Sequence, residues 1–169
     1  MTTVDLAGEL IGNVRTYTND VLDDLSAEAL TWRVDPTANT IAWLIWHLAR
    51  VQDDHVADLA GSEQVWSAEW AAWFGLDPDD TRIGYGDTPE QVQSVRPDSA
   101  ADLRDYLAAV TDRTLEFLTD GAPHDWDRIV DDDWDPPVTA RVRLASVITD
   151  TLQHLGQAAY VRGVYERVS

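Results

Sequence analysis

The chain has 169 residues, enough for a single domain with a sizeable buried core, and it contains no cysteine, which excludes disulfides, cysteine-ligated zinc and a thiol nucleophile of its own. Asp and Glu number 31 against 12 basic residues, all of them Arg, which gives a formal net charge of −19. Such a surface repels phosphate groups, so we expect neither nucleic acid nor an anionic membrane as a partner.

The spacing of apolar residues predicts the first two helices. Apolar side chains recur at helical intervals over residues 4–25, which is typical of an amphipathic helix with one core-facing side. A second helix has the sequence TIAWLIWHLARVQDDHVADLAG, with Asn39 or Thr40 as its N-terminal cap and Gly61 at its end. The second helix contains the most hydrophobic stretch of the chain, so we expect it to lie in the core.

A long connection over residues 62–98 follows the second helix. It begins with Trp66, Trp70 and Trp73, whose helical spacing is typical of packing or of a subunit interface, and continues with sequence punctuated by Gly and Pro. Long connections in compact domains often carry function or cover an interface. The Trp-rich part is therefore a candidate interface of a homodimer.

Two further helices complete the pattern. The third is predicted over residues 99–118 and the fourth over residues 142–165, with a loop or a small hairpin at residues 124–140 between them. Four helices with two short connections and one long one predict an all-α four-helix bundle. We find no internal repeat or change of composition, so we expect one domain over residues 1–169.

The start of the chain and its hydropathy predict a cellular location. The segment MTTVDLAGELIGNV lacks the basic stretch followed by an apolar one that marks a signal peptide. No run of 18 uncharged apolar residues occurs, as a membrane-spanning helix requires. We therefore expect a cytoplasmic protein without a membrane anchor.

One histidine and one Asp–His pair are candidates for a metal site. His47 lies in the hydrophobic stretch of the second helix, and we expect it to be buried. Asp150 and His154 are four residues apart on the fourth helix and project from the same face. Bundles build internal metal sites from such a pair and a third ligand on a facing helix. Two His and one Asp suit a divalent ion such as zinc and leave a coordination position open for water or substrate.

The same residues have an ordinary interpretation, which spacing alone leaves open. The buried histidine can be a core residue with a satisfied proton, and the pair can be a common helical side-chain pair. We expect His55 to be solvated on the polar face of its helix, and His124 to be exposed in a loop. The acidic run at 131–135 lacks the central Gly and the terminal Glu of an EF-hand loop, so we expect a solvated turn.

Three segments together resemble a known family. They are NTIAWLIWHLARVQDDHV on the second helix, IGYGDTPEQV in the long connection and DTLQHLGQAAYVRG on the fourth helix. Over nearly its whole length the chain resembles the DinB-like metal-binding four-helix bundles, and among them the actinobacterial mycothiol-dependent branch that includes a maleylpyruvate isomerase. The resemblance implies the same bundle with the long connection between its second and third helices.

The resemblance also implies a metal site and an activity. Similar proteins hold a divalent metal, usually zinc or nickel, at positions that match His47, Asp150 and His154, although the isomerase has Glu where this chain has Asp150. Gln157 and Asp54 are candidates for orienting the imidazole rings. The implied function is a metal-dependent transferase that uses a low-molecular-weight thiol, mycothiol, and a small electrophile. The alternatives are a metal-dependent hydrolase and a non-catalytic metal-binding, ligand-binding or stress-related bundle.

Overall fold

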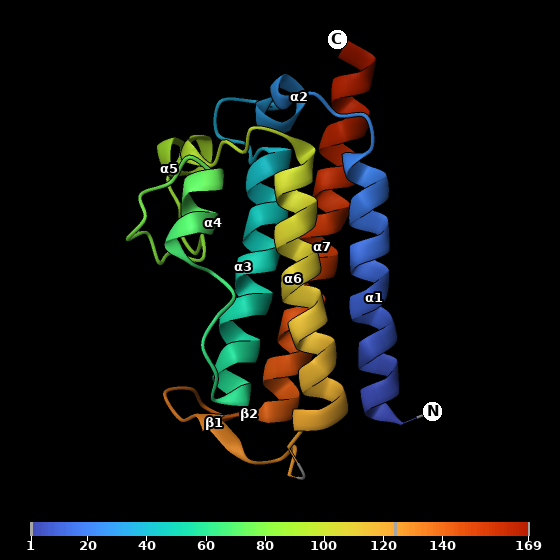
Figure 1. Cartoon of the computed structure of the whole chain (residues 1–169), viewed down its shortest axis with the longest axis vertical. Helices are drawn as coiled ribbons and strands as arrows, with labels where there is room; N and C mark the ends of the chain where they lie inside the picture. The colour runs from blue at the N-terminus through green and yellow to red at the C-terminus, as the bar shows by residue number, and fades with distance from the viewer. Residues whose placement is uncertain (1, 124, 169) are drawn as a thin grey trace.

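The computed structural model describes residues 2–123 and 125–168, and its long helices form a bundle (Figure 1). Helix α3 packs against α6 and α7, and α1 packs against the same two helices from the other side of the bundle. The predicted all-α four-helix bundle is therefore confirmed. Its long helices are α1 (Thr3–Leu22), α3 (Ile41–Ala60), α6 (Ala100–Glu116) and α7 (Ala140–Val168).

Shorter elements lie at the ends and on one side of the bundle (Figure 1). A π-helical turn extends α6, and the hairpin expected at residues 124–140 is present as two short antiparallel strands. His124, which we expected to be exposed, lies outside the described residues. The shorter elements are α2 (Ala27–Thr31), α4 (Ala68–Trp73), α5 (Pro89–Ser94), the turn η1 (Phe117–Gly121), β1 (Ile129–Asp131) and β2 (Val138–Thr139).

The helix ends follow from local capping. The Thr40 side chain accepts a hydrogen bond from the backbone N–H of Trp43 and so begins α3, and Gly61 ends it with a left-handed φ of 64°. The first helix is shorter than the prediction of residues 4–25. The chain is extended at Asp23 and left-handed at Asp24 (φ 56°), after which Ser26 caps α2 as a separate helix.

Helix α3 is the centre of the core. Every residue from 41 to 53 is buried, because α6 and α7 cover one side of the helix while α2 and the long connection cover the other. Two of the tryptophans in the connection, Trp66 and Trp70, pack against this core, whereas Trp73 is 41% exposed. The Trp-rich segment therefore serves packing within the chain, and the homodimer stays a prediction. No helix in the described part of the chain is both long and apolar enough to cross a membrane.

A buried charge pair on α3 ties the connection to the bundle. The carboxylate of Asp53 accepts hydrogen bonds from the backbone N–H groups of Val65 and Trp66, each at 2.8 Å, and from the Tyr106 hydroxyl at 2.8 Å. The guanidinium of Arg50, 1% exposed, contacts the same carboxylate at 3.4 Å. Buried charges persist only when they are paired and hydrogen-bonded, and here the bonds fix where the connection begins.

Candidate metal centre

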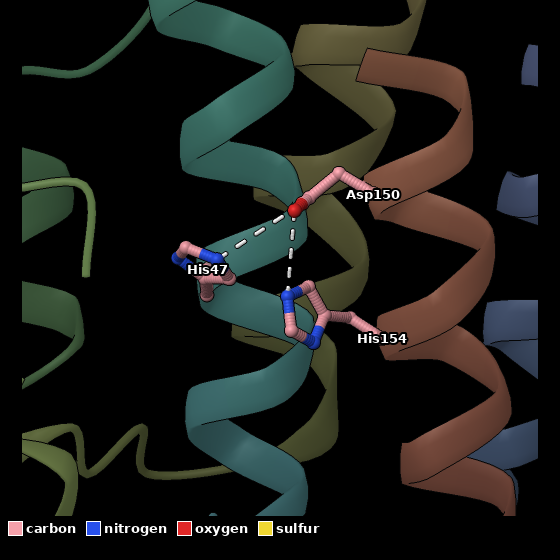
Figure 2. A group of neighbouring side chains, drawn as sticks. All are labelled: His47, Asp150 and His154. Carbon is pink, nitrogen blue, oxygen red and sulfur yellow. Dashed lines mark ion pairs between the residues drawn. The ribbon is translucent and has the colours of Figure 1, made fainter. Parts of the chain in front are cut away.

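Three side chains from two helices meet between α3 and α7 (Figure 2). His47 comes from α3, and Asp150 and His154 come from successive turns of α7. The Asp150 carboxylate lies 4.0 Å from Nε2 of His47 and 3.5 Å from Nε2 of His154. One donor atom from each residue lies within 4.8 Å of the other two, and no other group of three His, Asp or Glu side chains in residues 2–123 and 125–168 meets this condition. The structure thus brings together all three predicted ligands.

His47 is held as a neutral imidazole with one nitrogen free. The side chain is buried, and its Nδ1–H donates to the backbone carbonyl oxygen of Ile83 at 2.5 Å. Because a carbonyl can only accept, the proton resides on Nδ1 and the lone pair on Nε2 faces Asp150. Burial lowers the pKa of His47 and outweighs the hydrogen bond to Ile83, which raises it. A neutral ring with a free Nε2 is the form that binds a metal.

Trp43 on α3 and Gly84 in the long connection pack against the His47 ring. The indole of Trp43 stacks on the ring at 4.6 Å between centres, and its Nε1–H donates to Asp87 at 2.8 Å. Gly84 adopts a φ of 99°, and a Cβ at this position would lie only 2.6 Å from Nδ1 of His47. Glycine is therefore required both by the backbone conformation and by the close approach. These residues were not predicted as part of the site, although the paired glycines of the IGYG segment were a signal for such an approach.

His154 is oriented by a neighbour on its own helix. Its Nδ1 lies 3.0 Å from Oε1 of Gln157, an acceptor, so the Nε2 atom is again the one left for a ligand. Burial by itself lowers the pKa of His154, but hydrogen bonds with Asp150 and Gln157 and the charge of Asp150 together outweigh it and raise this pKa. The expected role of Gln157 thus agrees with the geometry.

Asp150 completes the group with an oxygen that has no partner. The Oδ2 atom is buried and makes no hydrogen bond to any described residue, and its 4.0 Å distance to His47 is too long for one. A buried carboxylate oxygen without a donor is costly, and a cation among the three side chains removes that cost. Two imidazoles and one carboxylate form a donor set that suits zinc or nickel, so the residues present fit a divalent metal.

The other sequence candidates lie outside this group. Asp54, expected to orient an imidazole of the site, instead contacts Nδ1 of His55 at 3.3 Å and accepts from Gln64 at 2.8 Å, because its turn of α3 faces the start of the connection. His55 is half-buried rather than fully solvated, and that contact is with its sequence neighbour. In the acidic run, Asp131 pairs with Arg143 at 2.7 Å and residues 132–135 are exposed.

Comparison with known proteins agrees with this geometry. A conserved protein from Enterococcus faecalis, known from its crystal structure, is 32% identical and superimposes with a TM-score of 0.87 over 96% of each chain. Curated proteins give no match. The family model described as the DinB superfamily matches residues 11–158, a range that includes all three residues of the candidate metal centre. The chain therefore belongs to the DinB superfamily.

Proposed function

We propose that this protein is a metal-dependent thiol transferase in which His47, Asp150 and His154 hold one divalent metal ion. The observation that carries the proposal is the buried, unpartnered Oδ2 of Asp150, in a carboxylate that lies 4.0 Å from Nε2 of His47 and 3.5 Å from Nε2 of His154. Three protein ligands leave one position for an exogenous ligand, as in catalytic rather than structural zinc sites. Zinc is the ion we expect first, and nickel is the alternative.

The missing cysteine determines the source of the sulfur. No protein thiol exists in the chain, so the nucleophile must be a low-molecular-weight thiol, and the resemblance to the mycothiol-dependent branch favours mycothiol. A divalent metal held by His47, Asp150 and His154 would lower the pKa of a bound thiol and so prepare its sulfur for reaction with a small electrophile.

The protein's own residues prepare the site for that chemistry. Ile83 and Gln157 hold the two imidazoles in the orientation that directs both Nε2 atoms toward Asp150. Trp43 and Gly84 pack against His47 from behind and exclude water from that side. Substrates therefore approach from the side that the connection leaves open. The protein supplies geometry and charge, and the thiol supplies the reacting atom.

Metal analysis is the first test. Protein purified without a histidine tag is analysed by elemental mass spectrometry, as wild type and as His47→Ala. We expect about one equivalent of zinc or nickel in the wild type and its loss in the variant, because one ligand and the core packing around it are removed. A wild type that stays free of metal after reconstitution with zinc or nickel would contradict the proposal.

Thiol dependence is the second test. The metal-loaded protein is incubated with mycothiol and a small electrophile, and S-conjugate formation is measured by mass spectrometry against a thiol-free control and against metal-free protein. We expect conjugate formation that requires both metal and thiol. Turnover that requires metal but no thiol would instead identify a hydrolase. Metal binding with neither thiol-dependent nor thiol-independent turnover would indicate a non-catalytic binding module.

A further inference from the structure

The connection presents one aromatic side chain beside the candidate metal centre. Tyr85 lies between α4 and α5 and is 77% exposed. Its ring centre is 6.2 Å from that of His47, with the ring planes 70° apart, and its hydroxyl makes no hydrogen bond to any described residue. Exposed tyrosines are common on protein surfaces. The position of Tyr85 beside a candidate metal ligand distinguishes it from the other exposed tyrosines.

The backbone on both sides of Tyr85 is fixed. Gly84 and Gly86 adopt φ angles of 99° and 70°, which only glycine adopts without strain. Gly84 packs against the rings of His47, Trp43 and Trp46, since a Cβ there would lie 2.6, 3.1 and 3.1 Å from them. The Ile83 carbonyl oxygen accepts a hydrogen bond from Nδ1–H of His47. The position of Tyr85 relative to the metal ligand is therefore set by contacts with that ligand.

Two arginines hold the loop that carries Tyr85 in place by hydrogen bonds. The buried Arg50 donates to the backbone carbonyls of Thr81 at 3.1 Å and Arg82 at 3.3 Å. Arg82 in turn donates to the Asp87 carboxylate at 2.5 Å and to the Ser94 hydroxyl at 2.8 Å. Charge-assisted hydrogen bonds at both ends of a short loop make it rigid. Tyr85 thus projects from a fixed support, and its exposure is a built-in feature of the site.

Tyr85 has the properties of a residue that lines a substrate-binding site. An aromatic ring that remains exposed beside His47 offers an apolar face to whatever extends outward from the site. The overall charge of the chain narrows the class of ligand, since the net charge is −19 and the carboxylate of Asp87 is already paired with Arg82. A further negative charge is disfavoured there.

We propose that Tyr85 is a specificity-determining residue that favours neutral sulfur ligands carrying a planar group next to the sulfur. This inference rests on the proposed function, because it requires a thiol to bind at the open metal position. An aromatic pair adds stabilisation beyond area burial. For a planar ligand this corresponds to a preference of roughly three- to tenfold over a non-planar ligand of similar size.

The test uses the full chain loaded with cobalt, whose visible absorption reports sulfur coordination. Benzyl mercaptan and cyclohexylmethanethiol are titrated separately, and the ratio of their dissociation constants is compared between variants, so that intrinsic differences between the thiols cancel. We expect the ratio to fall roughly three- to tenfold in Tyr85→Ala and to be retained in Tyr85→Phe. Tyr17→Ala is the matched control, because Tyr17 is 53% exposed on α1, and it should leave the ratio unchanged.

Each outcome decides between the two proposals. An unchanged ratio in Tyr85→Ala, with both thiols bound, overturns the role of Tyr85 and leaves the thiol-transferase proposal standing. Cobalt-loaded wild type that binds neither probe thiol overturns the role of Tyr85, and the thiol-transferase proposal falls with it only if mycothiol also fails to bind. A loss of cobalt affinity in Tyr85→Ala also counts against the inference, since Tyr85 would then act on the metal ligands rather than on the substrate.

Discussion

His47 and His55 lie about two turns apart on α3, yet they have opposite surroundings. His47 directs its free nitrogen toward Asp150 and stands beside His154. His55 forms an ion pair with the neighbouring carboxylate of Asp54 and lines a surface hollow of about 460 Å³ that it shares with Arg143.

The facing helix explains the difference. Arg143 and Asp150 lie two turns apart on α7, so the side chain that this helix offers changes from a guanidinium to a carboxylate over the same interval. Arg143 is paired with Asp131 and offers no metal ligand, whereas the unpartnered carboxylate of Asp150 beside His47 attracts a cation. A histidine on one helix is thus a ligand candidate only where the packed helix completes the donor set.

Removing a predicted metal-binding side chain is the strongest test of the difference between the surroundings of His47 and His55. We expect His154→Ala to weaken zinc binding by more than about 100-fold, because it removes a ligand and not only the residue that orients it. His55→Ala is the matched control and should bind zinc as the wild type does. Both are measured by competition with a chromogenic chelator. Full occupancy in His154→Ala would show that the site is assigned wrongly.

Changing the carboxylate tests its charge separately from its shape. Asp150→Asn keeps the shape but removes the charge, and we expect zinc affinity to fall roughly 30- to 100-fold. Asp150→Glu should retain zinc, since it restores the ligand type of the isomerase-like relatives. Asp54→Asn makes the same change beside His55 and should have no effect on zinc. Equal losses of zinc affinity in Asp150→Asn and Asp54→Asn would contradict the conclusion that His47, and not His55, is a zinc ligand.

The loop that covers His47, and has no equivalent at His55, can be tested at its glycine. Gly84→Ala places a Cβ 2.6 Å from Nδ1 of His47 at a φ of 99°. We expect the free energy of unfolding of the metal-free protein to fall by about 2–3 kcal/mol, from overpacking and backbone strain together. Urea denaturation measures this loss. Gly86→Ala, whose Cβ meets no atom within 4 Å, should cost only about 1 kcal/mol from strain.

The smallest effect is expected at the residue that orients His154. Gln157→Ala removes the acceptor at Nδ1 and should weaken zinc binding about tenfold. Gln157→Glu keeps an acceptor there and should retain the affinity. Gln153→Ala, one turn earlier on the same exposed surface of α7, serves as the control for loss of a glutamine. Identical zinc affinities in the two alanine variants would mean that Gln157 does not position His154.

Local sequence signals determined where most of the fold's helices lie. The cap at Thr40 and the left-handed Gly61 act within one turn of the residues they affect, so both ends of α3 were predictable. The end of α1 was not, because the apolar spacing continues to Leu25 while the chain turns at Asp24 to start α2. That choice depends on packing against other helices, which outweighs local propensity.

The same division holds for the site. The spacing of Asp150 and His154 placed two donors on one helical face, since residues four apart share a face in any α-helix. Only the tertiary structure places His47 beside Asp150 and His154, because the pairing of the helices sets which turns face each other. For the same reason His55 lies in the surface hollow that Arg143 also lines. The Ile83 carbonyl and the support beneath Tyr85 were likewise decided by tertiary structure. A backbone carbonyl has no signature in the sequence, and its contact with His47 joins residues that only the packed connection brings together.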